Sequence, residues 1–127
     1  MVGIVIVSHS QKLAEGVKEL AEMMAREVPI AAAGGLEDNM LGTSYEKIKR
    51  AIEFVCGTDG AVVLMDMGSA VLTTELVVEN LKDELVVVVD APLVEGAVLA
   101  AIEAASNASL AEVVAAAKSA RDMKKLE

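Results

Sequence analysis

The only histidine of the 127-residue chain, His9, lies in the segment VSHS, between an apolar run at residues 2–7 and a stretch whose apolar residues recur at helical spacing. A neutral imidazole offers a lone pair on one ring nitrogen and keeps a proton on the other, and its ordinary pKa of about 6.5 makes this form common near neutral pH. Such a ring can act as a nucleophile toward phosphorus. It could equally cap the following helix or donate to a carbonyl, so position alone leaves both roles open.

A carboxylate follows another apolar run. Asp66 comes directly after residues 61–65, AVVLM, and opens the segment DMGSA. If its carboxylate accepted the imidazole N–H, it would fix the tautomer of His9 and stabilise the positive charge that develops on the ring. The simpler alternative is a strand-to-helix turn in which Asp66 binds backbone amides.

Neutral hydrogen-bond donors accompany these two residues. Helices predicted to begin near Ser10, Ser44 and Ser69 would direct unpaired N–H groups and the positive ends of their dipoles toward an anion. A phosphoryl group is the natural candidate, because hydroxyls and backbone amides can bind it without lysine or arginine. The candidate phosphate-binding residues are Ser8, Ser10, Gly42, Thr43, Ser44, Gly68 and Ser69. Each also has a structural alternative as a helix cap or a turn residue.

Other kinds of chemistry lack the residues they need. One histidine and one cysteine, Cys56, do not provide a zinc site, so we expect no metal and no cofactor. A phosphate-binding Walker loop, a dinucleotide fingerprint and a nucleophile elbow are all absent from the sequence.

The hydrophobic pattern predicts the elements that would position these groups. Strands are predicted at residues 2–7, 30–33, 61–65 and 84–90, each followed by a helix, with one extra helix at the end. The second strand is the weakest of the four because alanine is a poor strand former. Thr43 with Glu46, and Ser109 with Glu112, form capping-box patterns at two helix starts.

This order predicts an α/β fold, a doubly wound, mainly parallel four-stranded sheet flanked by helices. Right-handed crossovers favour a topology in which the first strand lies between the second and the third. Ligands bind at the carboxyl ends of such strands, where the strand order reverses. We therefore expect His9 and Asp66 to face each other across that crevice.

Composition narrows the class of protein. The formal net charge of −9 argues against nucleic-acid binding and against anionic membrane surfaces. The length fits one domain, and no apolar run is long enough to span a bilayer. Met1 leads into VGIVIV without a basic region, so we expect no signal peptide and a cytoplasmic protein.

Three segments together resemble a known family: GIVIVSHSQKLAEGV, GGLEDNMLGTSYEKI and VVLMDMGSAVLTTEL. They are similar to the phosphotransfer subunits of phosphoenolpyruvate (PEP)-dependent dihydroxyacetone kinase, the DhaM family, which are related to mannose-type enzyme IIA domains of the bacterial sugar phosphotransferase system (PTS). The resemblance covers residues 1–127 and implies a single enzyme IIA domain of this type.

The resemblance also implies partners and residue roles. His9 would accept a phosphoryl group from the phosphocarrier HPr and pass it to ADP bound on the nucleotide-binding subunit of dihydroxyacetone kinase. Asp66 would orient the ring, and Gly42, Thr43, Ser44, Gly68 and Ser69 would surround the phosphate. A homodimer is implied as well.

Three alternatives remain open at this point. The first is a mannose-type enzyme IIA in sugar transport, with the same chemistry at His9 but a IIB domain as acceptor. The second is a receiver-like signalling domain with a phosphoaccepting aspartate, although receivers need an acidic pair where this chain reads SHS. The third is a binding module without catalysis.

Overall fold

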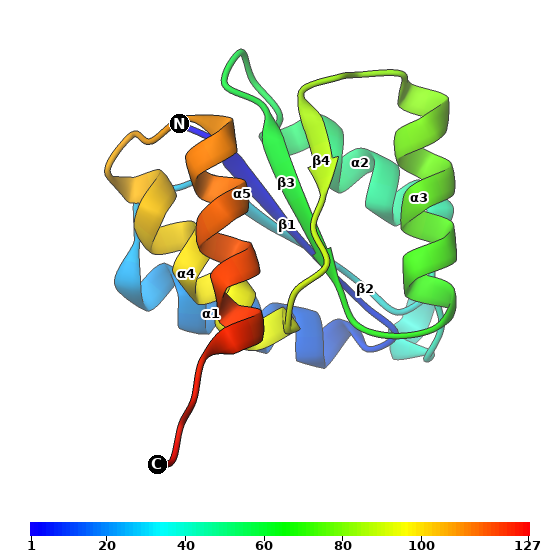
Figure 1. Cartoon of the computed structure of the whole chain (residues 1–127). Coiled ribbons are helices and arrows are strands. Elements are labelled where there is room, and N and C mark those ends of the chain that lie inside the picture. The colour runs from blue at the N-terminus through cyan, green and yellow to red at the C-terminus, as the bar shows by residue number, and fades with distance from the viewer.

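A computed structural model of the chain describes all 127 residues and contains one four-stranded parallel sheet between two layers of helices (Figure 1). The strands are β1 (Gly3–Ser8), β2 (Ile30–Gly34), β3 (Ala61–Met65) and β4 (Val86–Val88). The helices are α1 (Gln11–Met24), α2 (Tyr45–Val55), α3 (Ser69–Leu81), α4 (Leu93–Ala105) and α5 (Leu110–Ser119), with short 3-10 turns at Glu37–Asn39 and Ala120–Asp122. No helix is both long and apolar enough to cross a membrane.

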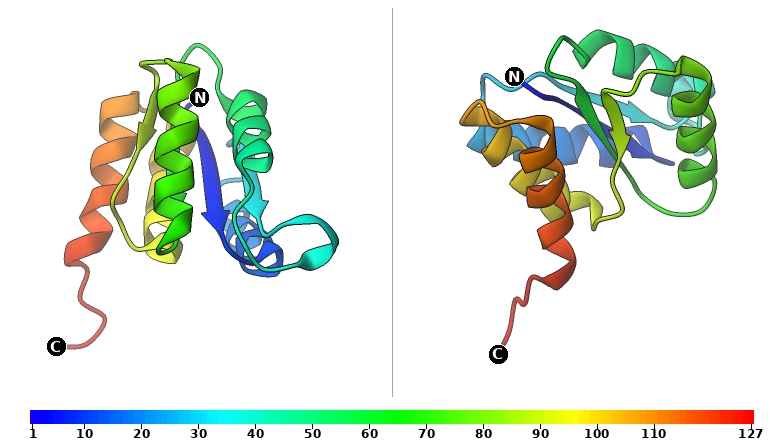
Figure 2. Two further views of the ribbon diagram at one scale, coloured as in Figure 1. Left: turned by 90° about the vertical axis from the view of Figure 1, so that its right-hand side faces the viewer. Right: turned by 45° about the horizontal axis from the view of Figure 1, so that its top comes forward.

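The strand order is β2-β1-β3-β4, so the predicted placement of the first strand between the second and third is confirmed. The views in Figures 1 and 2 place α1, α4 and α5 on one face of the sheet and α2 and α3 on the other. The fold is therefore the predicted doubly wound α/β arrangement. Its strand order reverses between β1 and β3, where the sequence predicts the site.

Strand β1 is buried on both faces. Its side chains alternate between two separate hydrophobic clusters. Ile4 and Ile6 pack with α1, α4 and α5, whereas Val5 and Val7 pack with α2 and α3. A strand that contacts helices on both faces needs apolar residues at every position, which explains the continuous apolar run.

Strand β2 forms despite its three alanines. It pairs in parallel with β1 from Ile30 to Gly34, so tertiary packing outweighs the low strand propensity of alanine. At its end Gly34 has to be glycine, because a Cβ atom there would collide with the carbonyl oxygen of Ser10 and with Cα of Gln11. This close approach brings the end of β2 against the start of α1, beside His9.

Two element boundaries differ from the predictions. Helix α1 ends at Met24 instead of near residue 27. Strand β4 covers three residues instead of seven. It begins only at Val86 because Asp83 forms a turn in which its backbone carbonyl accepts the amide of Val86 and its side chain accepts the amide of Leu85. Neither difference changes the sheet order or the edge at which the site lies.

Candidate active site at the ends of β1 and β3

His9 and Asp66 meet because β1 and β3 are neighbours in register. Val7 pairs with Met65, and the amide of Asp66 donates to the carbonyl of Val7 at 3.0 Å. The Nδ1 atom of His9 lies 2.9 Å from Oδ1 of Asp66, and the backbone amide of His9 donates to Oδ2 at 3.1 Å. One carboxylate thus contacts both the ring and the backbone of the same histidine.

Ser8 lies beneath this pair and is only 1% exposed. Its hydroxyl donates to Oδ2 of Asp66 at 2.8 Å and accepts the backbone amide of Ser10 at 3.0 Å. The sequence predicts Ser8 among the phosphate-binding residues, and the structure places its hydroxyl against the carboxylate that holds His9.

The hydrogen bonds around Asp66 determine its charge. Partial burial alone would raise the pKa of Asp66, but the hydrogen bonds from the Ser8 hydroxyl and from the amide and ring of His9 outweigh it. The pKa of Asp66 therefore lies below its usual value, and the group is a carboxylate at neutral pH. A carboxylate 2.9 Å from Nδ1 accepts a hydrogen bond from a protonated Nδ1, so the neutral ring has its lone pair on Nε2.

The Nε2 atom faces a cluster of hydroxyl groups. Ser69 Oγ lies 2.9 Å from Nε2 and 3.2 Å from Thr43 Oγ1, which in turn lies 3.3 Å from Thr73 Oγ1. The side chain of His9 is 32% exposed, so this side of the ring opens to solvent. Thr73 is not among the predicted residues. Its position one helical turn after Ser69 was the signal that could have identified it.

The N-terminus of α3 adds backbone donors beside the ring. The amides of Gly68 and Ser69 donate no hydrogen bond within the protein. Gly68, the residue before the helix, has φ +60° and ψ −123°, a conformation that residues with a Cβ rarely adopt. The positive end of the α3 dipole and these free amides suit an anion close to Nε2.

The other predicted residues have structural partners. Ser10 caps α1 by accepting the amide of Leu13, and Ser44 caps α2 by accepting the amide of Lys47, both at 3.2 Å. The predicted capping box at Thr43 is wrong by one residue, which leaves the Thr43 hydroxyl available to Ser69. The amide of Gly42 donates to the carbonyl of His9 at 2.9 Å.

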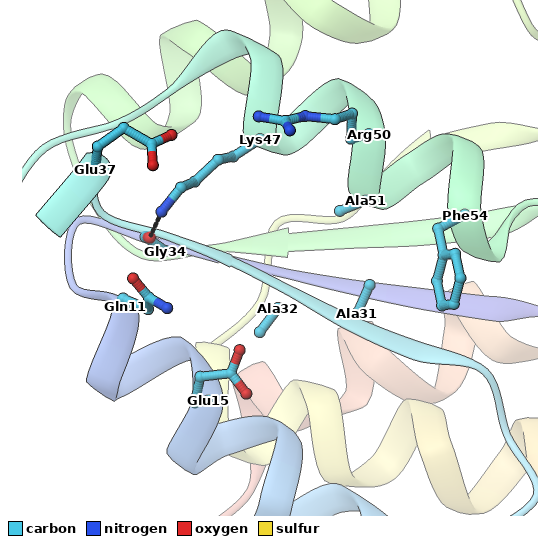
Figure 3. Close-up of a pocket in the computed structure, with 10 residues that line it drawn as sticks. All are labelled: Gln11, Glu15, Ala31, Ala32, Gly34, Glu37, Lys47, Arg50, Ala51 and Phe54. Carbon is cyan, nitrogen blue, oxygen red and sulfur yellow. Dashed lines mark hydrogen bonds between the residues drawn. The ribbon is translucent and has the colours of Figure 1, made fainter. Parts of the chain in front are cut away.

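Lys47 anchors the loop that carries Gly42 and Thr43. The Nζ atom of Lys47 donates to the carbonyls of Gly34, at 3.2 Å, and Leu36, at 2.9 Å. Lys47 lines a groove of about 550 Å³. Figure 3 shows the residues of this groove beside β2, between α1 and α2. The lining of the groove does not include His9 or Asp66, so it is separate from the hydroxyl cluster.

Asp90, the second carboxylate at this edge of the sheet, does not join the cluster. Its side chain is 90% exposed and lies 3.9 Å from Nη1 of Arg121. No group of three or more histidine, cysteine, aspartate or glutamate side chains is arranged to hold a metal ion.

Known proteins are similar to this chain in sequence and in fold. Residues 3–114 match the EIIA-man family, described as the PTS system fructose IIA component. The "PEP-dependent dihydroxyacetone kinase, phosphoryl donor subunit DhaM" of Escherichia coli is 44% identical, over 98% of this chain and 28% of its own length. The corresponding subunit of kinase 2 in Listeria innocua is 41% identical, over 86% of this chain and 90% of its own length.

Solved structures agree with the fold. A crystal structure of a protein of unknown function superimposes with a TM-score of 0.85 at 32% identity and covers both chains completely. The phosphotransferase system component EIIA from Streptococcus agalactiae superimposes with a TM-score of 0.71 at 16% identity, over 96% of this chain and 93% of that one.

The chain spans little more than a quarter of the length of several DhaM relatives, including those of Escherichia coli and Klebsiella michiganensis, and most of the length of the Listeria protein. The match over residues 3–114 and the alignment with the Escherichia coli protein over 98% of the chain extend across β1, β3 and the loops that carry His9, Asp66 and Ser69. The chain belongs to the EIIA-man family, and its curated relatives within that family are DhaM subunits.

Proposed function

We propose that this chain is a phosphoryl donor subunit of PEP-dependent dihydroxyacetone kinase and that it carries the phosphoryl group on Nε2 of His9. One observation carries the proposal. Asp66 holds the protonated Nδ1 of the only histidine, and the opposite nitrogen faces hydroxyls, free amides and solvent. The names of the relatives support the choice of reaction.

In the first step, the proposed donor is phosphorylated HPr. The Nε2 lone pair forms a bond to phosphorus while the bond between phosphorus and the donor breaks, and the donor keeps that electron pair. The proton on Nδ1 stays in place, so the phosphorylated ring becomes cationic. Asp66 stabilises this positive charge from 2.9 Å away.

The phosphoryl oxygens need donors during the transfer, because the transition state spreads negative charge over them. The hydroxyls of Ser69 and Thr43 and the free amides of Gly68 and Ser69 are available for that purpose. In this proposal, Ser10, Ser44 and Gly42 contribute by fixing helix starts and the loop.

In the second step, the proposed acceptor is ADP bound to the nucleotide-binding subunit of dihydroxyacetone kinase. A terminal phosphate oxygen of ADP forms a bond to phosphorus, the P–Nε2 bond breaks, and its electron pair returns to the neutral ring. The ATP that results then phosphorylates dihydroxyacetone. We place this cycle in the cytoplasm and assign it to a homodimer, as the family resemblance implies.

The test is stepwise phosphorylation with purified components. The protein is incubated with phosphoenolpyruvate, enzyme I and HPr, and the labelled residue is identified by mass spectrometry. We expect label on His9, none on a folded His9→Ala variant, and its discharge on addition of ADP with the nucleotide-binding subunit. Label on another residue, or no discharge to ADP, would contradict the proposal.

A second candidate is a mannose-type enzyme IIA in sugar transport, which the description of the matching family favours. It uses the same chemistry at His9, with a IIB domain as acceptor in place of ADP. Offering both acceptors to the phosphorylated protein distinguishes the two. The receiver-like alternative is disfavoured because the Asp66 carboxylate already accepts three hydrogen bonds from Ser8 and His9.

A further inference from the structure

The hydroxyl of Ser8 has a fixed direction. Its oxygen accepts the amide proton of Ser10, and an amide can only donate, so the proton of the hydroxyl must point elsewhere. The remaining partner is Oδ2 of Asp66, 2.8 Å away. Because Ser8 is buried, water does not compete for this hydrogen bond.

The two oxygens of Asp66 have different partners. Oδ2 accepts the Ser8 hydroxyl and the His9 amide, whereas Oδ1 is left for Nδ1 of His9. Anchoring Oδ2 from two sides fixes the rotation of the carboxylate about its terminal bond. That rotation decides whether Oδ1 lies in line with the ring nitrogen.

The position of the ring proton decides whether His9 can react. A free neutral imidazole favours the proton on Nε2, which would block the nitrogen that faces the hydroxyl cluster. A correctly placed carboxylate reverses this preference by accepting a hydrogen bond from a protonated Nδ1. Nothing else in the structure contacts Nδ1 as an acceptor, so the tautomer depends on Asp66.

We propose that Ser8 is a positioning residue that sets the tautomer of His9 through Asp66 and thereby keeps Nε2 unprotonated for phosphoryl transfer. This rests on the proposed function for the role of Nε2, but the effect on the ring proton exists without any phosphoryl donor. Ser8 does not contact the phosphoryl group in this arrangement. The Ser8 hydroxyl orients the Asp66 carboxylate, and the carboxylate in turn holds the proton of the His9 ring on Nδ1.

The experiment combines a spectroscopic and a kinetic measurement on four variants. The ¹⁵N NMR shifts of the His9 ring distinguish a protonated nitrogen from an unprotonated one, and they are recorded in the unphosphorylated protein at neutral pH. Single-turnover phosphorylation by phosphorylated HPr gives the rate. Ser8→Ala removes the hydroxyl, Ser8→Cys keeps the size with a weak donor, and Ser8→Thr keeps the hydroxyl.

The fourth variant, Ser109→Ala, is the matched control. Ser109 caps α5 through a capping box, far from His9 in the fold, so its loss removes one serine hydroxyl and some stability without touching the site. We expect Ser109→Ala to retain the wild-type tautomer and transfer rate.

In the wild type we expect a protonated Nδ1 and an unprotonated Nε2. Ser8→Ala should move both nitrogen shifts toward a mixture of tautomers and slow phosphorylation about tenfold, as expected for the loss of one hydrogen bond to a charged group. Ser8→Thr should restore both properties. If Ser8→Ala does not fold, Ser8→Cys is expected to give the same direction of change.

Two results would overturn the proposal. Wild-type ring shifts in Ser8→Ala or Ser8→Cys would show that the tautomer does not depend on Ser8, even if the rate fell. Wild-type rates with altered shifts would show that the tautomer does not limit transfer. If the wild type accepts no phosphate from HPr, the proposed function fails, and the ring shifts still decide whether Ser8 sets the tautomer.

Discussion

Both oxygens of the Asp66 carboxylate contact His9. Oδ1 contacts the ring at Nδ1, and Oδ2 accepts the backbone amide. The contact to the backbone amide fixes where the carboxylate lies, and the contact to Nδ1 fixes which nitrogen is protonated. An asparagine could keep the shape of this arrangement but not the charge. In the proposed mechanism, this charge stabilises the cationic, phosphorylated ring.

Asp66→Asn should therefore slow phosphoryl transfer on an intact fold. Loss of a charge-assisted hydrogen bond costs about 1.5–3 kcal/mol, which corresponds to roughly tenfold to over a hundredfold in rate. Single-turnover phosphorylation by phosphorylated HPr measures the rate, and a melting curve of the same sample checks the fold. A wild-type rate would reduce Asp66 to a turn residue, and a large drop in melting temperature would make it a structural cap.

The lowered pKa of Asp66 also predicts how stability depends on pH. A carboxyl group whose pKa is lower in the folded state stabilises the fold above its unfolded pKa of about 3.9, and this contribution is lost as the pH falls through the folded pKa. The difference in free energy of unfolding between wild type and Asp66→Asn should therefore shrink as the pH falls below about 4. Denaturant unfolding at several pH values measures it. A difference that stays constant down to about pH 2 would contradict the assignment.

The sequence predicts which residues meet at the site better than it predicts what each one binds. His9 and Asp66 could be paired because both follow buried strands that the topology places side by side. The direction of the Ser8 hydroxyl could not be predicted, because it depends on an amide two residues away and on a carboxylate 58 residues away. Thr73 was missed because the face that α3 presents to the loop depends on how that helix packs.

At the scale of the elements, the close contact between β2 and α1 can be tested with two glycines. Gly34→Ala should destabilise the fold by about 1–3 kcal/mol, because its Cβ would collide with backbone atoms of Ser10 and Gln11. Gly16→Ala is the control, because its Cβ would meet nothing within 4 Å and alanine favours a helix by about 0.5–1 kcal/mol. Urea denaturation of both variants measures these opposite effects, and equal stabilities would contradict the packing described for β2.

Lys47 allows a similar test of the loop that carries Thr43. Lys47→Met removes the two hydrogen bonds to the carbonyls of Gly34 and Leu36, so the loop should become more mobile and transfer several-fold slower. Amide hydrogen exchange of Gly42, whose N–H binds the carbonyl of His9, measures the mobility. Arg50→Met is the matched control because its Nε binds only the carbonyl of Glu46 in its own helix. Equal exchange in the two variants would contradict the role of Lys47.

The elements themselves were largely predictable, since the order of strands and helices follows from the hydrophobic pattern and the right-handed crossover rule. The capping box at Ser109 and Glu112 is confirmed. The capping box at Thr43 and Glu46 is wrong because the chain turns into α2 one residue later, at Ser44. Where two adjacent residues both carry hydroxyls, the sequence pattern does not predict which hydroxyl accepts the capping hydrogen bond.

Across the whole molecule, many large apolar side chains are exposed, among them Phe54, which is 84% exposed, and Met67 and Leu72 on either side of Ser69. Contiguous apolar patches are typical of surfaces that bind other proteins, and the resemblance to the DhaM family implies a homodimer. We expect a homodimer, and light scattering at tens of micromolar should give about twice the 13.2 kDa mass of one chain. A monomer mass at that concentration would contradict the prediction. The sequence alone could not identify these side chains as exposed, because apolar residues at helical spacing also fit a buried face.

The imidazole of His9 has only one open side, and this has a kinetic consequence. Asp66 closes the Nδ1 side, and Nε2 opens toward Ser69 and solvent. In the proposed cycle a phosphoryl group therefore has to leave along the path by which it arrived, so the proposed donor and acceptor must bind alternately to the same surface. Steady-state double-reciprocal plots should give parallel lines for the two substrates, as in a ping-pong mechanism, and each protein at high concentration should inhibit the reaction of the other.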